Sequence, residues 1–480
     1  MKKLFIYIIT AMALVSCGDF LEETSQDLIV PTKPHHFKEL IYGELIKGEV
    51  PLDNNVELMS DNVSSIYQVK NSEQDNRVKT FGFYAWQQSV EYDYNNAEAK
   101  DKMYEELYAG IVLCNAIEKE LESVSGTESE MASLYGEIYF YRALYYYYLA
   151  NLYGTPYVDA ASAAQSKCVP INTNTGIADE LYVRSTHKEV YDLMIENIVR
   201  SVDKFAESTE AVTIYRPNYE AACVLATRIF LTTKQFTKVI EYADKMEQLE
   251  TFYNLSDHLA KNDTIVDVFE DIDIPNFINE SNSEILFTHF NGFQANAFTY
   301  NTTGSAAGAY VPSPALVESY ETGDLRKIVF FDRENNLSKV TENINKHTVF
   351  FSNIRSVEAF LNKAEALAMT SGDAIAELNK LRAARFESEV PAISGDALTA
   401  VKQERYRELC FDGIRWFDLR RWGMPELTHE FPLEDGTRKV VFTLYEGDPA
   451  YTLSLPMDVT ELNDKIERHV RPERPGETVN

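Results

Sequence analysis

The chain has 480 residues, of which 45% are apolar and 12% aromatic, so it can bury a large core and is not a wholly disordered protein. Its 75 acidic residues outnumber its 45 lysines and arginines, which gives a formal net charge of −30. Such a surface repels nucleic-acid phosphates and anionic lipid headgroups, so the charge excludes a nucleic-acid partner.

The N-terminus predicts export. Lys2 and Lys3 precede an apolar run over residues 4–15, which is too short to span a bilayer and has the profile of a secretory signal. The run ends in "LVSC", residues 14–17, which resembles the lipobox of bacterial lipoproteins.

We therefore predict a lipoprotein signal peptide over residues 1–16 and a mature chain that begins at Cys17, whose thiol carries fatty-acyl chains such as palmitate. Several acyl chains hold a protein firmly to a membrane, whereas one chain anchors it only marginally. The alternative is a plain signal peptide beside an incidental cysteine. Residues 17–27 are predicted to form a flexible tether, and no later uncharged run is long enough to cross a membrane.

Most of the remaining chain is predicted to be helical. Over residues 97–121, apolar side chains such as Met103 and Leu107 recur every three or four residues and form one stripe. The segment 128–153 is apolar or aromatic almost all round, which indicates a helix buried on several sides and ended by Gly154. The other predicted helices cover residues 188–205, 217–232, 235–248, 355–369, 374–385 and 398–411.

Two pairs of these helices are predicted to form hairpins, with tight turns at "TTK" after Leu231 and at "TSGD" after Met369. Each pair covers roughly the length of a tetratricopeptide repeat. The predicted fold class is therefore mainly α, with tetratricopeptide-like helical hairpins within about 97–250 and 355–411 that form a scaffold.

Two segments, 53–96 and 251–354, break the helical pattern. Asn, Asp, Gly, Thr and aromatic residues dominate them, as in "FNGFQANAFTYNTTGSAAGAYVPSP". Long irregular segments inside a compact domain are typical of functional regions or of disorder. We therefore predict a second, more irregular half that carries the ligand site on long loops, with a few short strands such as "KVVFTLY", residues 439–445.

No recognised catalytic motif is present in the sequence. Residues 43–49, "GELIKGE", have the glycine spacing of a Walker loop but glutamate where lysine must meet phosphate. "GSAAG", residues 304–308, misplaces the serine of a nucleophile elbow. We therefore predict binding rather than catalysis, with no cofactor and no metal. A glycosidase that uses two carboxylates stays an alternative, because 75 acidic residues leave any pairing unconstrained.

The cysteines after the lipobox show no metal-ligand spacing and no CxxC pair. Three of them lie in helical patterns beside apolar residues, which favours buried free thiols, although an exported protein could also form disulfides. They are Cys114, Cys168, Cys223 and Cys410.

Several segments, in this order, together identify a family. They include "LVSCGDFLEE", "EIYFYRALYYYYLANLYGTPYV", "YRPNYEAACVLATRIFLTTKQFTKVIEYAD", "PSPALVESYETGDLRK", "RSVEAFLNKAEALAMTSGDAIAELNKLRAAR" and "ERYRELCFDGIRWFDLRRWG". They resemble the SusD/RagB family of outer-membrane nutrient-binding lipoproteins of Bacteroidota, nearly from end to end. One departure is Tyr104, where many relatives carry tryptophan, and it concerns packing more than function.

The resemblance implies a single SusD-like domain over residues 28–480, in which four tetratricopeptide-like hairpins support a more irregular ligand-binding half. It also implies exposure on the cell outer membrane and a SusC-like TonB-dependent transporter as partner. In that picture the lipoprotein is a lid that captures oligosaccharide and delivers it to the pore, without catalysis. Because some relatives take peptides or other nutrients, the ligand could also be a peptide. A scaffold that grips only a protein partner is a further alternative.

The candidate ligand-binding residues come from the two irregular segments, because the family's contacts follow no fixed motif. A glycan site needs aromatic platforms for the flat sugar faces and amide or charged side chains for the hydroxyls. Ordinary packing is the alternative for each single aromatic, above all for Trp86, because "YAW" recurs in relatives. The predicted ligand-binding residues are Asp61, Asn62, Tyr67, Tyr84, Trp86, Tyr92, Tyr94, Asn95, Phe293, Asn296, Phe298, Tyr300 and Tyr310.

The segment 405–423, "RYRELCFDGIRWFDLRRWG", gathers five arginines around two tryptophans and two phenylalanines. It could bind an anion or belong to the scaffold. Because the resemblance makes it a signature shared by members with different ligands, we predict scaffold. Helical spacing predicts ion pairs of Glu408 with Arg405, Asp412 with Arg415, and Asp418 with Arg415 and Arg421, and stacking of Arg420 on Trp416 and of Arg421 on Phe417.

Overall fold

The computed structural model describes most of the chain beyond the predicted tether. The described residues are 31–46, 54–66, 77–176, 181–266, 277–279, 281–290, 310–331, 337, 339, 350–433 and 436–479. The predicted signal peptide, Cys17 and the tether lie outside them. Within the described ranges, no helix is both long and apolar enough to cross a membrane.

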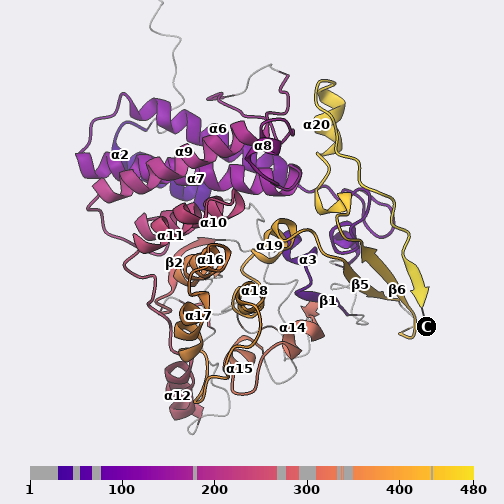
Figure 1. Ribbon diagram of the computed structural model, residues 1–480. Coiled ribbons are helices and arrows are strands. Elements are labelled where there is room, and N and C mark those ends of the chain that lie inside the picture. Colours follow the sequence, from indigo (N-terminus) through magenta and orange to yellow (C-terminus); the bar gives the residue numbers. More distant parts are fainter. Residues whose placement is uncertain are drawn as a thin grey trace, which may run out of the picture.

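A layer of long helices forms the N-terminal half (Figure 1). Helix α7 (Glu128–Tyr153) lies between α6 (Met103–Leu121) and α9 (His187–Glu207) and packs against both. Short helix α2 (Pro34–Ile41), followed by a single π-turn, η1 (Tyr42–Ile46), covers this layer.

Helix α7 is buried on nearly all sides, as its sequence predicts, and it begins and ends where predicted. A capping box starts it, in which the Thr127 side chain accepts from the Glu130 amide and the Glu130 side chain accepts from the Thr127 amide. Small residues let its neighbours approach closely. A Cβ at Gly110 of α6 would collide with the ring of Tyr145, so α6 and α7 pack with almost no space between them.

Both predicted helical hairpins are present. Helix α10 (Tyr219–Thr232) turns into α11 (Phe236–Asp244) through Lys234, and α16 (Ser356–Met369) turns into α17 (Ala374–Ala383) through Ser371. Lys234 and Ser371 adopt the left-handed conformation, with φ of 59° and 60°, which reverses the chain within a few residues. Helix α11 packs on α16, so the two hairpins stack on each other as repeat units do.

The predicted ends of the other helices shift by a few residues. The largest difference is at α6, which begins at Met103 instead of residue 97. Just before the helix, the Asp101 side chain accepts from the Met103 amide at 3.3 Å. Helix α18 (Ala397–Glu408) ends three residues before the predicted residue 411. The fold is mainly helical, as predicted.

Short strands join the two predicted irregular segments. Strand β1 (Val63–Ser65) pairs antiparallel with β3 (Tyr310–Pro312), so residues far apart in the sequence lie side by side. Strand β2 (Ile285–Phe290) pairs antiparallel with β4 (Phe350–Arg355), with irregularities in register. The irregular segments also contain the short helices α3 (Asn54–Leu58), α5 (Phe81–Tyr84), α12 (Leu255–Val266), α14 (Pro314–Glu318) and α15 (Arg326–Phe330). Another short helix, α8 (Ala160–Ala163), lies between α7 and α9.

A three-stranded antiparallel sheet closes the C-terminal side (Figure 1). Strand β5 (Leu427–Pro432) alternates buried and exposed residues, as a strand with one covered face does. It pairs with β6 (Lys439–Leu444), at the predicted strand "KVVFTLY", and β6 pairs with β7 (Glu477–Val479). Between β6 and β7 lie the short helix η2 (Pro449–Tyr451) and helix α20 (Met457–Leu462), which stands at the edge of the molecule.

Candidate ligand-binding pocket

Four of the predicted ligand-binding residues lie in the core. Asn62, Tyr84, Trp86 and Tyr310 are all at most 1% exposed. Tyr84 and Trp86 hold the ring of His429 between them, with centroids 4.3 and 4.1 Å away. Because no face of these rings reaches the surface, they pack the core and offer no platform to a sugar in this conformation.

Each of these buried side chains also has a structural hydrogen bond. Trp86 donates through its indole N–H to the Met59 carbonyl at 2.9 Å, which supports the packing alternative for this residue. The Tyr310 and Thr80 hydroxyls are 2.7 Å apart, and Tyr84 donates to the Glu430 carbonyl at 2.9 Å. These bonds tie the two irregular segments to each other and to β5.

The accessible candidates lie elsewhere. Asp61 forms a bidentate ion pair with Arg415, whose Nε lies 2.7 Å from the carboxylate, and its side chain stays 29% exposed. Tyr94 is 43% exposed and stacks on Phe431 with centroids 5.1 Å apart. Asn95 beside it is also exposed. The remaining candidates, Tyr67, Phe293, Asn296, Phe298 and Tyr300, lie outside the described residues, so their role stays a prediction.

A pocket that was not predicted from the sequence lies beside Tyr92. The Tyr92 hydroxyl lies 3.7 Å from the Met457 sulfur at the start of α20. Next to it, Glu91 and Lys100 line a cavity of about 460 Å³, a volume within the usual range for small-ligand sites. The cavity lies between the start of α6, the chain around residue 170 and helix α20, so it joins segments far apart in the sequence.

Three tyrosines line this pocket: Tyr104, Tyr108 and Tyr182. The rings of Tyr104 and Tyr108, one turn apart on α6, lie 4.9 Å from each other. Tyr108 donates to the Pro170 carbonyl at 2.7 Å, and the Tyr182 hydroxyl donates to the Asn172 side chain at 3.1 Å. These bonds hold the rings of Tyr108 and Tyr182 in the pocket wall, so that a flat ligand can meet them with little further ordering. Tyr104 is 6% exposed and supports the ring of Tyr108.

Polar groups stand around the tyrosines. Asp101, Asp458, Asn172 and Asn463 line the same cavity, where they can meet hydroxyl groups. Burial and, to a smaller extent, the charge of Glu91 raise the pKa of the Asp101 carboxyl to about 6, although the hydrogen bond from the Met103 amide acts in the opposite direction. The arrangement combines aromatic faces with amide and carboxyl edges, which is the chemistry that a sugar requires.

Sequence reasoning missed this pocket for a physical reason. Tyr104 and Tyr108 have the spacing of an ordinary buried helix face, so the pattern predicts packing for them. Tyr182 and Asn463 lie 281 positions apart and meet only in the tertiary structure, where the Asn463 side chain donates to the Tyr182 carbonyl at 2.7 Å. The available sequence signal for the pocket was the pair of tyrosines, Tyr104 and Tyr108, in the first turns of α6.

The segment 405–423 belongs to a network of buried ion pairs. Arg326 of α15, Arg355 of β4 and Arg385 after α17 all contact the Glu408 carboxylate, at 3.1, 2.9 and 2.9 Å. Burial alone would raise the pKa of Glu408, but these three guanidinium groups outweigh it and hold the pKa well below its usual range. The other members of the network include Asp324, Glu284, Lys339, Glu404 and Asp412.

Most of the ion pairs predicted from helical spacing inside 405–423 are wrong. Arg405 and Glu408 lie in the same helix but pair with other residues, and Asp412 and Arg415 do not pair because the helix does not continue between them. Helix α18 ends at Glu408, Phe411 and Gly413 adopt φ of 60° and 72°, and α19 (Arg415–Arg421) starts in a new direction. One predicted pair is confirmed, Asp418 with Arg421 at 2.7 Å. The other ion pairs differ from the predicted ones: Arg405 pairs with Asp418, Arg415 with Asp61, Asp412 with Lys339 and Arg355, and Glu408 with the three arginines above.

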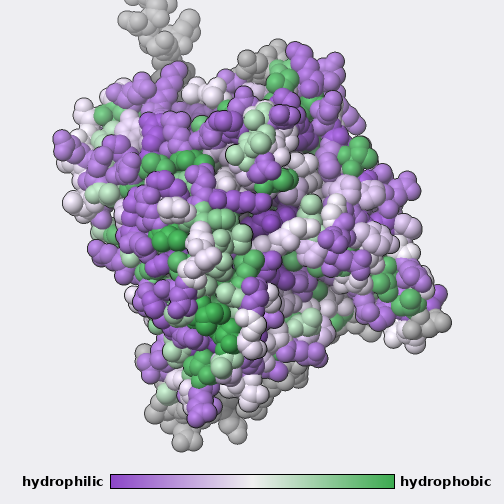
Figure 2. Space-filling view, in the orientation of Figure 1, coloured by the Kyte–Doolittle hydropathy of each residue, from purple (hydrophilic) through white to green (hydrophobic). Residues whose placement is uncertain are grey.

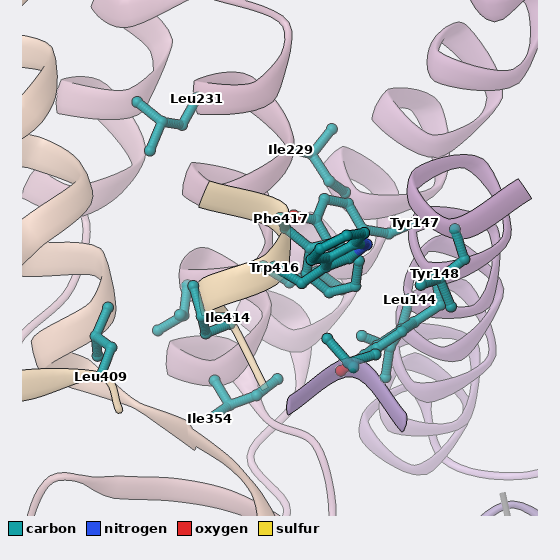
Figure 3. Close-up of a cluster of buried hydrophobic side chains, with 14 of the residues drawn as sticks. Leu144, Tyr147, Tyr148, Ile229, Leu231, Ile354, Leu409, Ile414, Trp416 and Phe417 are labelled. Carbon is teal, nitrogen blue, oxygen red and sulfur yellow. The ribbon is translucent and has the colours of Figure 1, made fainter. Parts of the chain in front are cut away.

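The predicted arginine stacking is replaced by aromatic packing. Trp416 is fully buried and stacks on Tyr451 with centroids 4.7 Å apart. Phe417 meets the rings of Tyr147 and Tyr148 edge-on at 5.4 and 5.5 Å, so α19 is inserted against α7 (Figure 3). Arg421 lies over Trp422 instead of Phe417, 4.8 Å from the ring centroid. These contacts support the scaffold interpretation of the segment.

The described parts of the chain contain no candidate metal-ligand cluster and no disulfide. There, no group of three or more His, Cys, Asp or Glu side chains could hold a metal ion. The cysteines Cys114, Cys168, Cys223 and Cys410 are buried free thiols. Burial raises the pKa of Cys114 and Cys168 to about 12, which keeps these thiols protonated and unreactive.

Helical hairpins that carry an irregular half with a tyrosine-lined pocket define a repeat-scaffold binding protein. Two family models match the chain: SusD-like_3, described as starch-binding associating with outer membrane, over residues 19–231, and SusD_RagB, the SusD family, over residues 338–468. Together they cover well over half of the chain. The protein belongs to the SusD/RagB family.

Solved structures agree on the fold. A SusD superfamily protein from Bacteroides thetaiotaomicron superposes with a TM-score of 0.70 at 18% identity, over 92% of this chain and 100% of that chain. A SusD superfamily protein from Bacteroides fragilis (0.67, 20%, 92% and 100%) and a SusD-like carbohydrate-binding protein from Bacteroides vulgatus (0.67, 18%, 92% and 99%) are similar to the same extent. A search of curated proteins finds no match.

Proposed function

We propose that this protein captures oligosaccharides at the outer surface of the outer membrane and delivers them to a SusC-like TonB-dependent transporter, without cleaving them. The observation that carries the proposal is the pocket in which Tyr104, Tyr108 and Tyr182 stand among amide and carboxyl groups. The starch-binding description of the first family model and the carbohydrate-binding relative from B. vulgatus support a glycan. The lipobox supports a tether through Cys17.

Calorimetry with a panel of neutral oligosaccharides and of peptides tests the ligand class. Tyr182→Ala removes an aromatic face from the pocket, so we expect about tenfold weaker oligosaccharide binding, which corresponds to about 1.4 kcal/mol. Tyr182→Phe keeps the face and loses the two hydroxyl bonds, to Asn172 and Asn174, so it should bind better than the alanine variant. Tyr445→Ala is the matched control, because Tyr445 is 62% exposed and does not line the pocket. Binding of peptides alone would refute the glycan assignment, and shorter sugar products after incubation would refute capture without cleavage.

The anchor and the partner are tested on the full chain in its own membranes. Cys17→Ala should move the protein from the membrane fraction to the soluble fraction when the transporter is deleted. The wild-type chain should copurify with the transporter after mild detergent extraction. A Cys17→Ala protein that stays in membranes lacking the transporter would contradict the lipid anchor.

A further inference from the structure

The charged side chains that line the tyrosine pocket are mostly acidic. In the described structure, carboxyl groups outnumber ammonium groups two to one in its wall. The carboxyl groups belong to Glu91, Asp101, Glu105 and Asp458, and the ammonium groups to Lys100 and Lys102. The same wall carries the rings of Tyr108 and Tyr182, so a sugar that stacks on these rings meets this charge directly.

Ion pairs compensate only part of the negative charge. The Glu91 carboxylate lies 3.0 Å from the Arg468 guanidinium and also accepts from the Met457 amide at 3.1 Å. Lys100 lies 3.3 Å from Glu98, so its positive charge is already shared with a carboxylate outside the wall. Once these two pairs are set aside, three carboxyl groups of the wall remain against one ammonium group, and these four residues are Asp101, Glu105, Asp458 and Lys102.

Asp101 lies at the inner side of the pocket. Its carboxyl accepts from the Met103 amide at the start of α6, one residue before Tyr104. The ring of Tyr104 lies 5.0 Å from that of the buried Tyr153. Burial and, to a smaller extent, the charge of Asp101 raise the pKa of Tyr153, so the carboxyl is close to the protein interior. Because the dielectric constant is lower there than at the exposed rim, a charge at Asp101 acts more strongly on a bound group.

An acidic wall treats neutral and acidic sugars differently. Ionised carboxyl groups accept hydrogen bonds from sugar hydroxyls, so a neutral sugar can satisfy them. A sugar carboxylate also only accepts, so it cannot bond to an ionised carboxyl group, and the two like charges repel each other. We propose that the pocket admits neutral glycans and excludes those that carry carboxylates, and that Asp101 is the main residue that excludes them. This rests on the proposed function, because it concerns the sugar that the same pocket captures.

Calorimetry on the full mature chain tests the exclusion with matched sugars. Maltotriose, cellotriose, laminaritriose and mannotriose are each compared with the uronate obtained by oxidising their C6 alcohols, which adds charge and changes the shape little. At about pH 7.5 we expect each uronate to bind at least about tenfold more weakly than the neutral sugar from which it is made. Uronates that bind as tightly as the neutral sugars overturn this inference and leave glycan capture intact. If the protein binds neither set nor any oligosaccharide of the wider panel, glycan capture itself is refuted and the inference with it.

The pH dependence of the wild-type chain tests the role of Asp101 without a variant. With a pKa of about 6, its carboxyl is mostly ionised at about pH 7.5 and mostly neutral at about pH 5, whereas a sugar carboxylate stays ionised at both. Acid should therefore bring the affinity of a uronate closer to that of its neutral counterpart. An affinity ratio that stays constant over this range contradicts the role of Asp101.

Other charged groups surround the pocket, but no histidine lines it in the described structure. Arg184 lies near the Tyr104 hydroxyl and has Glu467 beside it, so it does not reverse the negative balance. The remaining charged groups around Asp101 are Glu91, Glu98, Lys100, Lys102, Glu105, Asp458 and Arg468.

Two variants that remove one negative charge each locate the effect. Asp101→Asn keeps the size of the side chain and an oxygen that can accept from the Met103 amide. It should narrow the affinity gap between neutral sugar and uronate about tenfold and remove the pH dependence of that gap. Glu122→Gln is the matched control, because Glu122 is exposed at the opposite end of α6 and does not line the pocket, so the gap should stay. A gap that survives Asp101→Asn in full, or that closes equally in both variants, overturns the assignment to Asp101.

Discussion

The protein buries two kinds of arginine, and they differ in what surrounds them. Arg326, Arg355 and Arg385 are at most 1% exposed, and all three share the carboxylate of Glu408. Arg420 and Arg471 are almost as deeply buried, yet only carbonyl and hydroxyl oxygens meet them. The first set lies below the helical layer, where α15, β4 and α17 meet, and the second lies at η2.

The difference separates two uses of buried charge. A network whose members are all paired holds distant segments in one arrangement, and it fails when one partner is removed. Arg420 and Arg471 bond instead to uncharged oxygens, so no ion pair among the described residues holds them in place. The face shown in Figure 2 is mostly hydrophilic, as the composition requires. The contrast between the two arginine sets lies in the interior, because all five side chains are buried.

Acid should destabilise the protein mainly through the buried carboxylates that are paired with arginines. The folded-state pKa values of Glu408, Glu365 and Asp418 lie below their ordinary values, because the guanidinium attraction outweighs burial. Lowered carboxyl pKa values contribute stability that is complete above the unfolded pKa, near 4.5 for glutamate, and that is lost as the pH falls through the folded pKa. We expect the free energy of unfolding, measured in urea, to fall steeply below about pH 4.5. A flat profile between pH 5 and 3 would show that these carboxyls are not held ionised.

Glu408→Gln should be the most damaging single change in this comparison. It removes the shared anion and leaves three guanidinium groups short of negative charge, so we expect a loss of about 3–5 kcal/mol in the free energy of unfolding. Urea titration followed by tryptophan fluorescence measures it. The control is Glu430→Gln, whose partner Lys439 is exposed and whose loss should be at most about 1 kcal/mol. Equal losses in the two variants would remove the distinction.

Arg415→Met should have an intermediate effect. The Arg415–Asp61 pair is bidentate, but the carboxylate is 29% exposed and can be hydrated when its partner is lost. We expect a loss of about 1–2 kcal/mol in the same urea assay. A loss as large as that of Glu408→Gln would mean that exposure does not govern the energy of these pairs.

Arg471→Met should have the smallest effect. Methionine fills the space with an apolar chain and removes a buried charge that has no carboxylate partner, so we expect a change within about 1 kcal/mol. A loss above about 3 kcal/mol would place Arg471 with the paired set.

The helical part could be predicted in detail, because its signals are local. Apolar periodicity locates α6 and α9, the capping box of Thr127 starts α7, and Gly154 follows its last residue. The hairpin turns at Lys234 and Ser371 could be placed from short polar stretches between periodic segments. Charge pairing could not be predicted, since helical spacing favours neighbours and Glu408 finds its partners 82, 53 and 23 positions away.

The candidate site divides in the same way. Composition and the irregular segments indicate that aromatic residues gather there, but not which rings are covered. Tyr310 became core because β3 pairs with β1 and its ring lies 5.1 Å from that of Tyr84. Tyr84 and Trp86 became core because they enclose the ring of His429. Tyr182 became part of a pocket wall because the chain after α20 lies against it.

By itself, the sequence determined the helical hairpins, the family, and the prediction of an exported and tethered binder, because these depend on local periodicity and on ordered motifs. The tertiary structure alone decided which tyrosines line the pocket and which buried arginines have a carboxylate partner. Burial and charge compensation are sums over neighbours that are distant in the chain, and the sequence does not state who those neighbours are.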